Sequence, residues 1–336
     1  MRLHFDGDRT DSDPMLSYSQ KLAPIRRGAR VRGALRRGVV GVLTLSGIPR
    51  ILVEQRIRRS LHVVGSSGDE DASSKKPQEI IVRPRMCIYA HYDVGNDLSE
   101  HDTQFLKWIL SKGIGLVVVS TASLDPSADN LKKLREQGVS VIVRENYGLD
   151  FASWQCGLDA LGADLEKVEW IYLINSSLYG PVRTDVDIFS PPTSSTNVYG
   201  LTASREYTFH AHSYFLGFDR KAIQQLAFKN FFSSISTSES KWSVILNSEL
   251  SWLRYFSRAG LTVGTLFEPS RKRTINPLTR QWLNLLDVGF PFIKKSLFIQ
   301  NYDAVDLGDW QEQVERLAGK PLCDVIKRDV ERRRLS

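Results

Sequence analysis

The chain has 336 residues, 42% of them hydrophobic and 25% charged, with a formal net charge of +7. This composition is typical of a soluble globular protein and leaves room for one large core or two smaller ones. The three cysteines, Cys87, Cys156 and Cys323, are widely spaced, which excludes a disulfide framework and a zinc motif and indicates a reducing compartment. The first residues are charged and no apolar stretch follows them closely, so no signal peptide is expected.

The positive charge is concentrated near the N-terminus. Residues 1–20 are polar and acidic and are expected to be disordered. Residues 21–60 contain eleven Lys or Arg and one acid, Glu54, which gives about +10 and leaves about −3 for all other residues. We therefore expect the basic segment 21–62, rather than the main domain, to bind an acidic partner.

The basic segment alternates arginine with Val, Leu and Ile, and its apolar centre, 39–48, is too short to span a bilayer. This pattern predicts an amphipathic segment lying on an anionic membrane surface. The alternative is a basic helix that docks on the domain or stays partly disordered, and glycines at 38, 41 and 47 argue against a stable isolated helix. Nucleic-acid binding is not expected, because the segment lacks aromatic residues for stacking on bases.

A Ser/Asp/Lys-rich linker, 63–80, leads into the main domain at 81–330. In the first half of this domain, apolar β-branched runs alternate with segments of helical pattern. The predicted strands are 86–92, 116–120, 139–143 and 170–174, and the predicted helices are 102–111, 128–137 and 152–161. This alternation predicts an α/β fold that has a mainly parallel sheet with helices on both faces.

The pattern changes in the second half of the domain. Two further strands are predicted at 198–202 and 212–218, and helices at 221–235, 242–259 and 276–286, the last with Pro277 in its first turn. We expect residues 81–183 to form a ligand-binding half and residues 184–330 an α+β half that covers one side of the ligand edge.

Three polar loops should meet at one edge of the sheet, because right-handed crossovers bring the carboxyl ends of parallel strands together. The loops are 91–93, 146–150 and 175–177. In the first loop, Tyr92 could stack on a nucleobase and Asp93 could accept a hydrogen bond from a base N–H or a ribose hydroxyl. The alternative is a strand end with a turn-forming Asp.

The stretch 144–155 is the most informative about function. It is a short connection from a strand to a helix, and it contains a charged side chain, an amide, a glycine and the start of the helix. Arg144 and Asn146 supply the charge and the amide. Gly148 allows a positive φ or a close backbone approach, and Asp150 can cap the helix or hold a sugar hydroxyl. The alternative is a capped loop with a solvated Arg144–Glu145 pair.

Two further groups of polar residues follow strands. Asn175 and Ser177 can form hydrogen bonds but are poor ligands for Mg²⁺ or Mn²⁺, and a plain polar strand exit is the alternative. His210 and His212 stand at i and i+2 of a strand and so share a face. A zinc pair would need a third ligand, which is not evident, so contact with a phosphate or a hydroxyl is expected instead.

Glu249 is the candidate general base. It stands in the predicted 242–259 helix among apolar and aromatic neighbours. A carboxylate on an apolar helix face has its pKa raised and can then take up a proton near neutral pH. The alternative is a Glu on the protein surface.

Taken together, these segments resemble the rhamnan synthesis protein F family, a group of bacterial polysaccharide glycosyltransferases. The resemblance is carried, in order, by residues 88–93, 118–121, 144–154, 175–181, 200–202, 210–215, 276–277 and 291–295. It implies a fold similar to GT-A glycosyltransferases. It also implies a nucleotide-sugar donor, typically dTDP-L-rhamnose, and a cell-surface glycan that is extended on the cytoplasmic side of the membrane.

The chain departs from the family pattern at two positions. The family commonly has Asn-Asp-Ser where this chain has Asn175-Ser176-Ser177, which removes the expected metal-ligating carboxylate and puts dependence on Mg²⁺ or Mn²⁺ in doubt. It commonly has Gln where this chain has His212, which points to a change of donor sugar or acceptor.

The resulting hypothesis is a glycosyltransferase that acts on a glycan or lipid-linked glycan at the inner face of the cytoplasmic membrane. Its donor would be held by the three loops and by the histidine pair: Tyr92, Asp93, Arg144, Asn146, Gly148, Asp150, Asn175, Ser177, His210 and His212. Glu249 would deprotonate the acceptor. Two rivals remain: a non-catalytic nucleotide-sugar or carbohydrate-binding protein, and a basic N-terminus that serves as an arm for nucleic acid or a partner protein.

The basic segment generates a binding prediction. The full chain should bind anionic lipid vesicles, and a shortened protein starting at Ile80 should not. Each Lys or Arg near a negative leaflet contributes about 1 kcal/mol, and burial of apolar side chains from 39–48 adds a contribution that salt does not screen. Binding, measured by vesicle co-sedimentation, should therefore weaken but persist as salt rises. Equal binding by both proteins would contradict the anchor.

Overall fold

The computed structural model describes residues 80–204, 209–235, 251–267 and 276–335. The segments 1–20 and 21–62, the linker up to residue 79, and the candidate base Glu249 lie outside the described residues.

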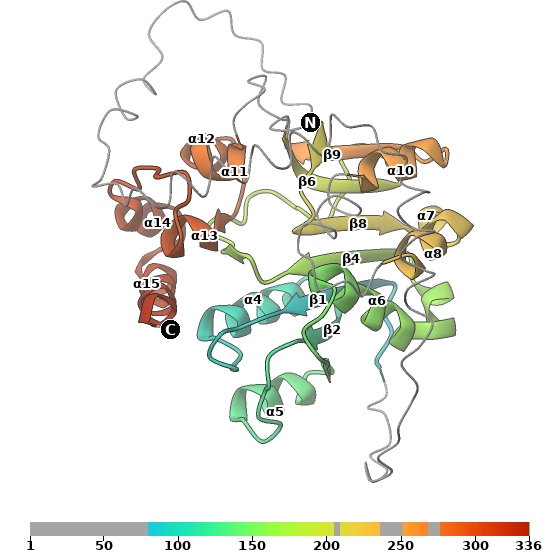
Figure 1. Cartoon of the computed structure of the whole chain (residues 1–336), viewed down its shortest axis with the longest axis horizontal. Helices are drawn as coiled ribbons and strands as arrows, with labels where there is room; N and C mark the ends of the chain where they lie inside the picture. Colours follow the sequence, from blue (N-terminus) through green and yellow to red (C-terminus); the bar gives the residue numbers. More distant parts are fainter. Residues whose placement is uncertain (1–79, 205–208, 236–250, 268–275, 336) are drawn as a thin grey trace, which may run out of the picture.

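The centre of the described fold is a sheet of eight strands (Figure 1). Its order is β3-β2-β1-β4-β8-β6-β7, with β9 pairing with β6. The strands are β1 (Arg85–His91), β2 (Gly115–Ser120), β3 (Ser140–Val143), β4 (Trp170–Asn175), β6 (Val198–Ser204), β7 (His210–Ala211), β8 (Phe215–Asp219) and β9 (Val263–Phe267). β1 to β4 are parallel, which confirms the prediction for the first half. The second half is mixed, because β8 runs antiparallel to both β4 and β6.

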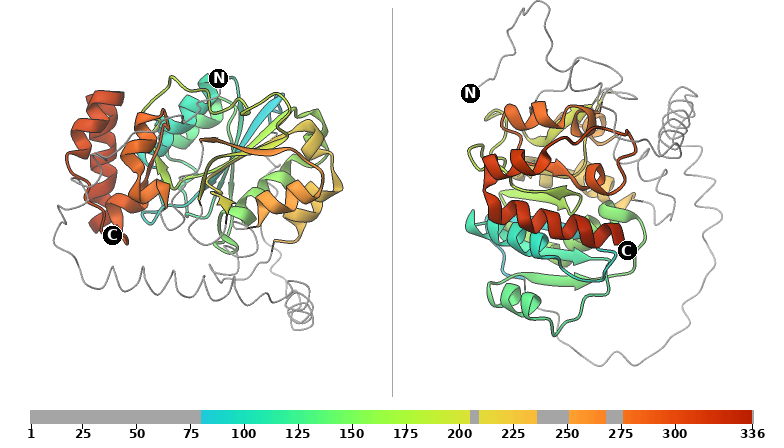
Figure 2. Two further views of the ribbon diagram at one scale, coloured as in Figure 1. Left: turned by 90° about the horizontal axis from the view of Figure 1, so that it is seen from above. Right: turned by 90° about the vertical axis from the view of Figure 1, so that its left-hand side faces the viewer.

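The strand directions define one edge of the sheet. Because β4 and β6 are both antiparallel to β8, they are parallel to each other. The carboxyl ends of β1, β2, β3, β4 and β6 therefore lie along the same edge. Three C-terminal helices, α13 (Lys295–Ile299), α14 (Trp310–Ala318) and α15 (Lys320–Leu335), stand on that side, to the left in Figure 1. Figure 2 shows α15 lying across this side of the sheet.

Helices cover both faces of the sheet, as predicted. α4 (Glu100–Ser111) and α5 (Asp129–Glu136) pack on one face, and α6 (Leu149–Leu161), α8 (Leu226–Ser233) and α10 (Trp252–Arg258) on the other. Successive side chains of a strand point to opposite faces of the sheet, so one strand contributes to both cores. Cys87 and Tyr89 of β1 belong to the first core, and Met86 and Ile88 belong to the second.

α6 approaches the sheet closely and is fixed to it at two points. A Cβ at Gly157 would lie 2.5 Å from Ile88 Cγ2, so only glycine allows this approach. The indole N–H of Trp154 donates to the Ile174 carbonyl (3.1 Å) in the interior. The first turns of α6 are thereby held beside the end of β4.

Several elements of the second half differ from the prediction. The strand predicted at 212–218 begins only at Phe215, because a turn at Ser213 and Tyr214 separates β7 from β8. The 221–235 helix breaks after α7 (Arg220–Ile223), and the chain restarts as α8. Asn276 caps α11 (Pro277–Arg280) by accepting from the Leu278 N–H, as a first-turn proline suggests, but α12 (Trp282–Asp287) then starts anew.

The C-terminal helices were not predicted, and they build a third hydrophobic cluster. Tyr179, Trp282, Phe298, Val314 and Ile326 are among its buried members. A short antiparallel pair, β5 (Leu178–Tyr179) with β10 (Ile293–Lys294), joins this cluster to the end of β4. The strands of both proposed halves belong to one sheet, and α15 extends past residue 330.

Within the described ranges, the structure contains no helix that is long and apolar enough to cross a bilayer.

Candidate active site

Ser176 joins the ends of β1 and β4. Its backbone N–H donates to the Ala90 carbonyl (3.0 Å), and its hydroxyl accepts from the Tyr92 N–H (3.2 Å). The Tyr92 carbonyl lies 3.4 Å from the same hydroxyl. The loops after β1 and β4 therefore meet, as predicted, and the Tyr92 side chain stays 47% exposed beside them.

Asn175 links the end of β4 to the start of α6. Its side-chain amide donates to Asp150 Oδ2 (2.7 Å), and its Oδ1 accepts from the backbone N–H (3.1 Å) and the hydroxyl (2.6 Å) of Ser177. Asp150 is half-buried in the first turn of α6, where the positive end of the helix dipole favours a carboxylate. The second and third predicted loops are thus brought together.

Arg144 shapes the loop after β3. Its guanidinium donates to the carbonyls of Glu145 (2.8 Å) and Leu149 (3.0 Å), and also to that of Tyr147. Its Nε donates to the Ser153 hydroxyl (3.1 Å). The charge stays at the sheet edge, but the N–H groups are used by the loop itself, and Glu145 contributes its carbonyl here.

The same loop contains two consecutive residues in the left-handed region, Gly148 (φ 63°) and Leu149 (φ 52°). Gly148, and not Asp150, is the N-cap of α6, so the capping role considered for Asp150 is wrong. A left-handed residue with a side chain costs about 1–2 kcal/mol, which the bonds from Arg144 to the loop carbonyls help to offset. Asn146 is exposed in this loop.

The histidine pair lies beside the end of β6, but only His210 belongs to a strand, β7, and His212 follows it, so the prediction that one strand carries both is wrong. His210 and His212 are both buried, with ring centroids 5.5 Å apart. His212 Nδ1 lies 2.9 Å from Thr202 Oγ1, which also contacts the Tyr214 hydroxyl (2.8 Å). Burial, and then the neighbouring His210, hold the pKa of His212 well below its usual value, so this imidazole is neutral at pH 7.

Asp93, a candidate donor ligand, is held by arginines from the far end of the chain. Arg332 donates to both carboxylate oxygens (2.7 Å each), and Arg333 donates to Oδ2. Both arginines also bind Asp329, one helical turn earlier in α15. We call the contact of Asp93 with Arg332 and Arg333 the arginine clamp. Burial would raise the pKa of Asp93, but the arginines outweigh it and hold the pKa below its usual value.

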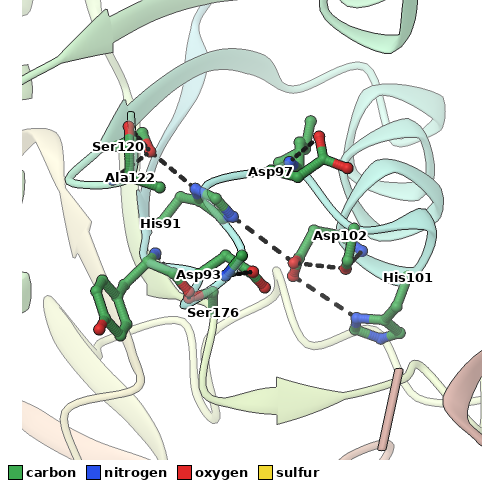
Figure 3. A network of polar contacts seen from close by, with 12 residues as sticks. His91, Asp93, Asp97, His101, Asp102, Ser120, Ala122 and Ser176 are labelled. Atoms are coloured by element: carbon green, nitrogen blue, oxygen red, sulfur yellow. Dashed lines mark hydrogen bonds and ion pairs between the residues drawn. The ribbon is translucent and has the colours of Figure 1, made fainter. Parts of the chain in front are cut away.

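A buried carboxylate next to the clamp, Asp102, was not predicted (Figure 3). It accepts from the hydroxyls of Tyr89 (2.9 Å) and Ser99 (2.7 Å) and from Lys295 Nζ (3.1 Å). The imidazoles of His91 and His101 each lie 3.7 Å from it. Burial would raise the pKa of Asp102, but Lys295 and the imidazoles hold it well below its usual value.

This network contains a Ser-His-Asp sequence of contacts that is not a nucleophilic triad. His91 Nδ1 lies 2.9 Å from Ser120 Oγ, on the opposite side from Asp102 (Figure 3). However, Ser120 is fully buried and its hydroxyl accepts from the Ala122 N–H (3.0 Å), so it is not open to a substrate. The network is a structural core behind the strand ends. The only signal for it in the sequence was the period-2 placement of Tyr89 and His91 in β1.

The residues at the edge fit a divalent-metal site poorly. In the described part of the chain no group of three or more His, Cys, Asp or Glu is placed to hold a metal ion. The Ser176 hydroxyl is bound to the Tyr92 backbone, and the Asp93 carboxylate is bound by the clamp. Mg²⁺ favours carboxylates and phosphate oxygens, and the segment after β3 carries two carboxylates, Glu145 and Asp150.

The buried histidines predict a pH-dependent stability. The pKa of His101, like that of His212, lies below 6.5 because of burial. The unfolded chain therefore binds protons below about pH 6.5 that the folded chain does not. Stability should be lost as the pH falls below this value, by up to about 1.4 kcal/mol per pH unit for each histidine.

Urea unfolding at about pH 7.5 and pH 5.5 measures this loss, and His212→Gln should remove its share of the difference. The carboxylates Asp93, Asp102 and Asp329 have lowered pKa values. They stabilise the fold above about pH 3.9, and this stabilisation is lost below that pH. The loss therefore falls outside the pH range of the histidine measurement. The same free energy of unfolding at both pH values would contradict the assignment to buried neutral histidines.

Comparison with known proteins gives the relatives of this chain. The uncharacterized protein y4gN of Sinorhizobium fredii (strain NBRC 101917 / NGR234) is 28% identical over 230 residues, which cover 67% of this chain and 58% of that protein. The virulence protein VirA of Vibrio anguillarum (strain ATCC 68554 / 775) is 30% identical over 193 residues, which cover 48% of this chain and 62% of that protein. The chain thus spans about three fifths of the length of these curated relatives.

A search of solved structures matches the crystal structure of a glycosyltransferase involved in the glycosylation of the major capsid of PBCV-1. The TM-score is 0.35 at 11% identity, and the match covers 63% of this chain and 93% of the other. The model of the family described as rhamnan synthesis protein F matches residues 116–331. Because this match covers well over half of the chain, the protein belongs to the rhamnan synthesis protein F family.

Proposed function

We propose that the protein is a glycosyltransferase of polysaccharide synthesis, which moves a sugar from a nucleotide-diphosphate donor to a growing cell-surface glycan. The single observation that carries the proposal is the contact between Asp150 and Asn175 at the edge where the strand-end loops meet. Ligands of open α/β sheets bind outside the carboxyl ends of the strands. Membership of the rhamnan synthesis protein F family supports the same class of reaction.

The donor would lie across the ends of β1, β3 and β4. Asp150 would accept hydrogen bonds from sugar hydroxyls, and Asn175 orients its carboxylate through the 2.7 Å contact. Tyr92 offers an accessible ring for the nucleobase. We further propose L-rhamnose or another deoxyhexose as the sugar, which the family resemblance supports.

The leaving diphosphate needs positive charge or fixed hydrogen-bond donors. Arg144 places a cation at the edge, although its N–H groups also hold the loop. His212 is neutral at pH 7 and would act as a hydrogen-bonding group rather than as a cation. The acceptor would enter beside the histidine pair, and Glu249 remains the proposed base that deprotonates its hydroxyl. A lipid-linked acceptor would suit the proposed location at the inner face of the membrane, reached through residues 21–62.

A non-catalytic nucleotide-sugar or carbohydrate-binding protein is the second candidate. It is favoured by Ser176, whose hydroxyl is bound to the Tyr92 backbone and supplies no carboxylate for a metal. Turnover separates the two candidates. Transfer of sugar, or hydrolysis of the donor, supports the enzyme, and binding without either across several acceptors supports the second candidate.

Asp150→Asn tests the donor site while it preserves the size of the side chain. If Asp150 holds donor hydroxyls, the donor Kd should rise about tenfold or more, because a hydrogen bond to a charged group contributes about 1.5–3 kcal/mol. Isothermal calorimetry with a panel of nucleotide sugars measures this change. Asp159→Asn is the matched control, since Asp159 is exposed on the same helix. An unchanged Kd in Asp150→Asn would remove this residue from the site.

We also propose that added Mg²⁺ or Mn²⁺ matters less to this protein than to relatives with Asp at position 176. A serine hydroxyl gives a hard cation little charge to bind, and that of Ser176 is already used. Transferase assays with EDTA should retain most of the activity. Complete loss with EDTA, restored by Mn²⁺, would show that other ligands are recruited, and Asp93 and His212 would be the first to substitute.

A further inference from the structure

The arginine clamp joins the two ends of the described chain. Asp93 lies two residues after the end of β1, and Arg332 and Arg333 stand in the last turn of α15. Arg332 binds one carboxylate oxygen with each of its two Nη atoms, at 2.7 Å. Both partners lie outside the 116–331 segment that the family model matches. The clamp is therefore a feature of this chain that the family match does not describe.

The charged groups of the arginine clamp are largely buried. The Asp93 side chain is fully buried and that of Arg333 nearly so, whereas Arg332 is about one third exposed. Arg332 and Arg333 hold the pKa of the carboxyl below its usual range, against the opposing effect of burial, so Asp93 is charged at neutral pH. Two-pronged contacts between arginine and carboxylate fix orientation as well as energy. Removing one partner of a buried pair leaves charge without compensation.

The loop after β1 is shaped to receive Arg332. The Gly95 N–H donates to Asp93 Oδ1 (2.7 Å), and the Asn96 N–H donates to the Asp93 carbonyl (3.3 Å). A Cβ at Gly95 would lie 2.6 Å from Arg332 Nη1, so glycine leaves the space that the guanidinium fills. Just before Asp93, the Tyr92 N–H is bound to Ser176 of the candidate active site.

We propose that the last turn of α15 positions the donor-binding loop, with Arg332 and Arg333 acting through Asp93 on the loop that carries Tyr92. The inference rests on the proposed function, because it takes this loop to contact the nucleotide sugar. The role proposed for the arginines runs through their contact with Asp93, so they are positioning residues. Without the clamp, the binding-competent conformation of the loop is populated less, and the apparent donor affinity falls by the same factor.

The test compares three full-length variants with substitutions in the same helix, Arg332→Gln, Arg332→Lys and Arg328→Gln. Arg332→Gln breaks the two-pronged contact. Arg328→Gln is the control, because Arg328 pairs with Glu100 (2.8 Å) on the surface, where both side chains are more than half exposed. Hydrogen–deuterium exchange of the 92–96 peptide is measured without ligand, and the donor Kd, KM and kcat are measured with nucleotide sugars.

Arg332→Gln should speed exchange at 92–96 and raise the donor Kd and KM about tenfold, as expected if the competent loop falls to a tenth of the population. The kcat at saturating donor should change much less. Arg328→Gln should behave as the wild type in all of these measurements. Arg332→Lys keeps the positive charge but cannot form the two-pronged contact. Its exchange rate, Kd and KM should therefore lie between those of Arg332→Gln and those of the wild type.

The two measurements separate failure of the inference from failure of the proposed function. Unchanged exchange at 92–96 in Arg332→Gln overturns the inference, whatever the protein binds. Faster exchange with an unchanged donor Kd also overturns it, because the loop would then be held by the clamp without serving the donor. A third result is that the wild type binds no nucleotide sugar while exchange at 92–96 still rises in Arg332→Gln. The proposed function then fails, and the donor role of the clamp fails with it, although the clamp still holds the loop. A kcat that falls as far as KM rises would also overturn the inference, because the substitution would then disturb the fold as a whole and not the loop alone.

Discussion

The structure depends on a set of opposite charges buried between the sheet edge and the C-terminal helices. Three carboxylates that are almost inaccessible to water are matched by three cations, namely Asp93, Asp102 and Asp329 with Lys295, Arg332 and Arg333. Burying a carboxylate costs several kcal/mol unless a partner and hydrogen bonds compensate, and here each has both. Because the partners come from α4, α13 and α15 and from the loop after β1, one network holds these segments together.

This network holds one of the three loops of the candidate active site. The loop after β1 is held by the ion pairs of Asp93 with Arg332 and Arg333. On the β4 side, the Asn175 amide donates to the Asp150 carboxylate, and the Ser176 hydroxyl accepts from the Tyr92 N–H. The left-handed turn at Gly148 and Leu149 is held by a third device, the guanidinium of Arg144. Three different interactions thus bring three loops to one edge of the sheet.

Much of the first half could be predicted from the sequence, because its signals are local. β-branched runs such as the one in β2 indicate strands, and the handedness of crossovers then brings the loops with Tyr92, Asp150 and Asn175 to one edge. The charge network could not be predicted, since Asp93 and Arg332 are 239 residues apart and neither stands in a distinctive pattern. The breaks in the second half, such as the turn at Ser213, depend on tertiary packing that overrides local preference.

The antiparallel strand β8 has a consequence for how this protein can evolve. Because β8 lies between β4 and β6, the two halves of the sheet share their backbone hydrogen bonds. Neither half can be exchanged as a unit with that of another protein without leaving two inner strands unpaired, which is costly in an interior. A new ligand preference is therefore more accessible through changes in the loops at the strand ends, where residues can vary while the hydrogen bonds between the strands stay intact.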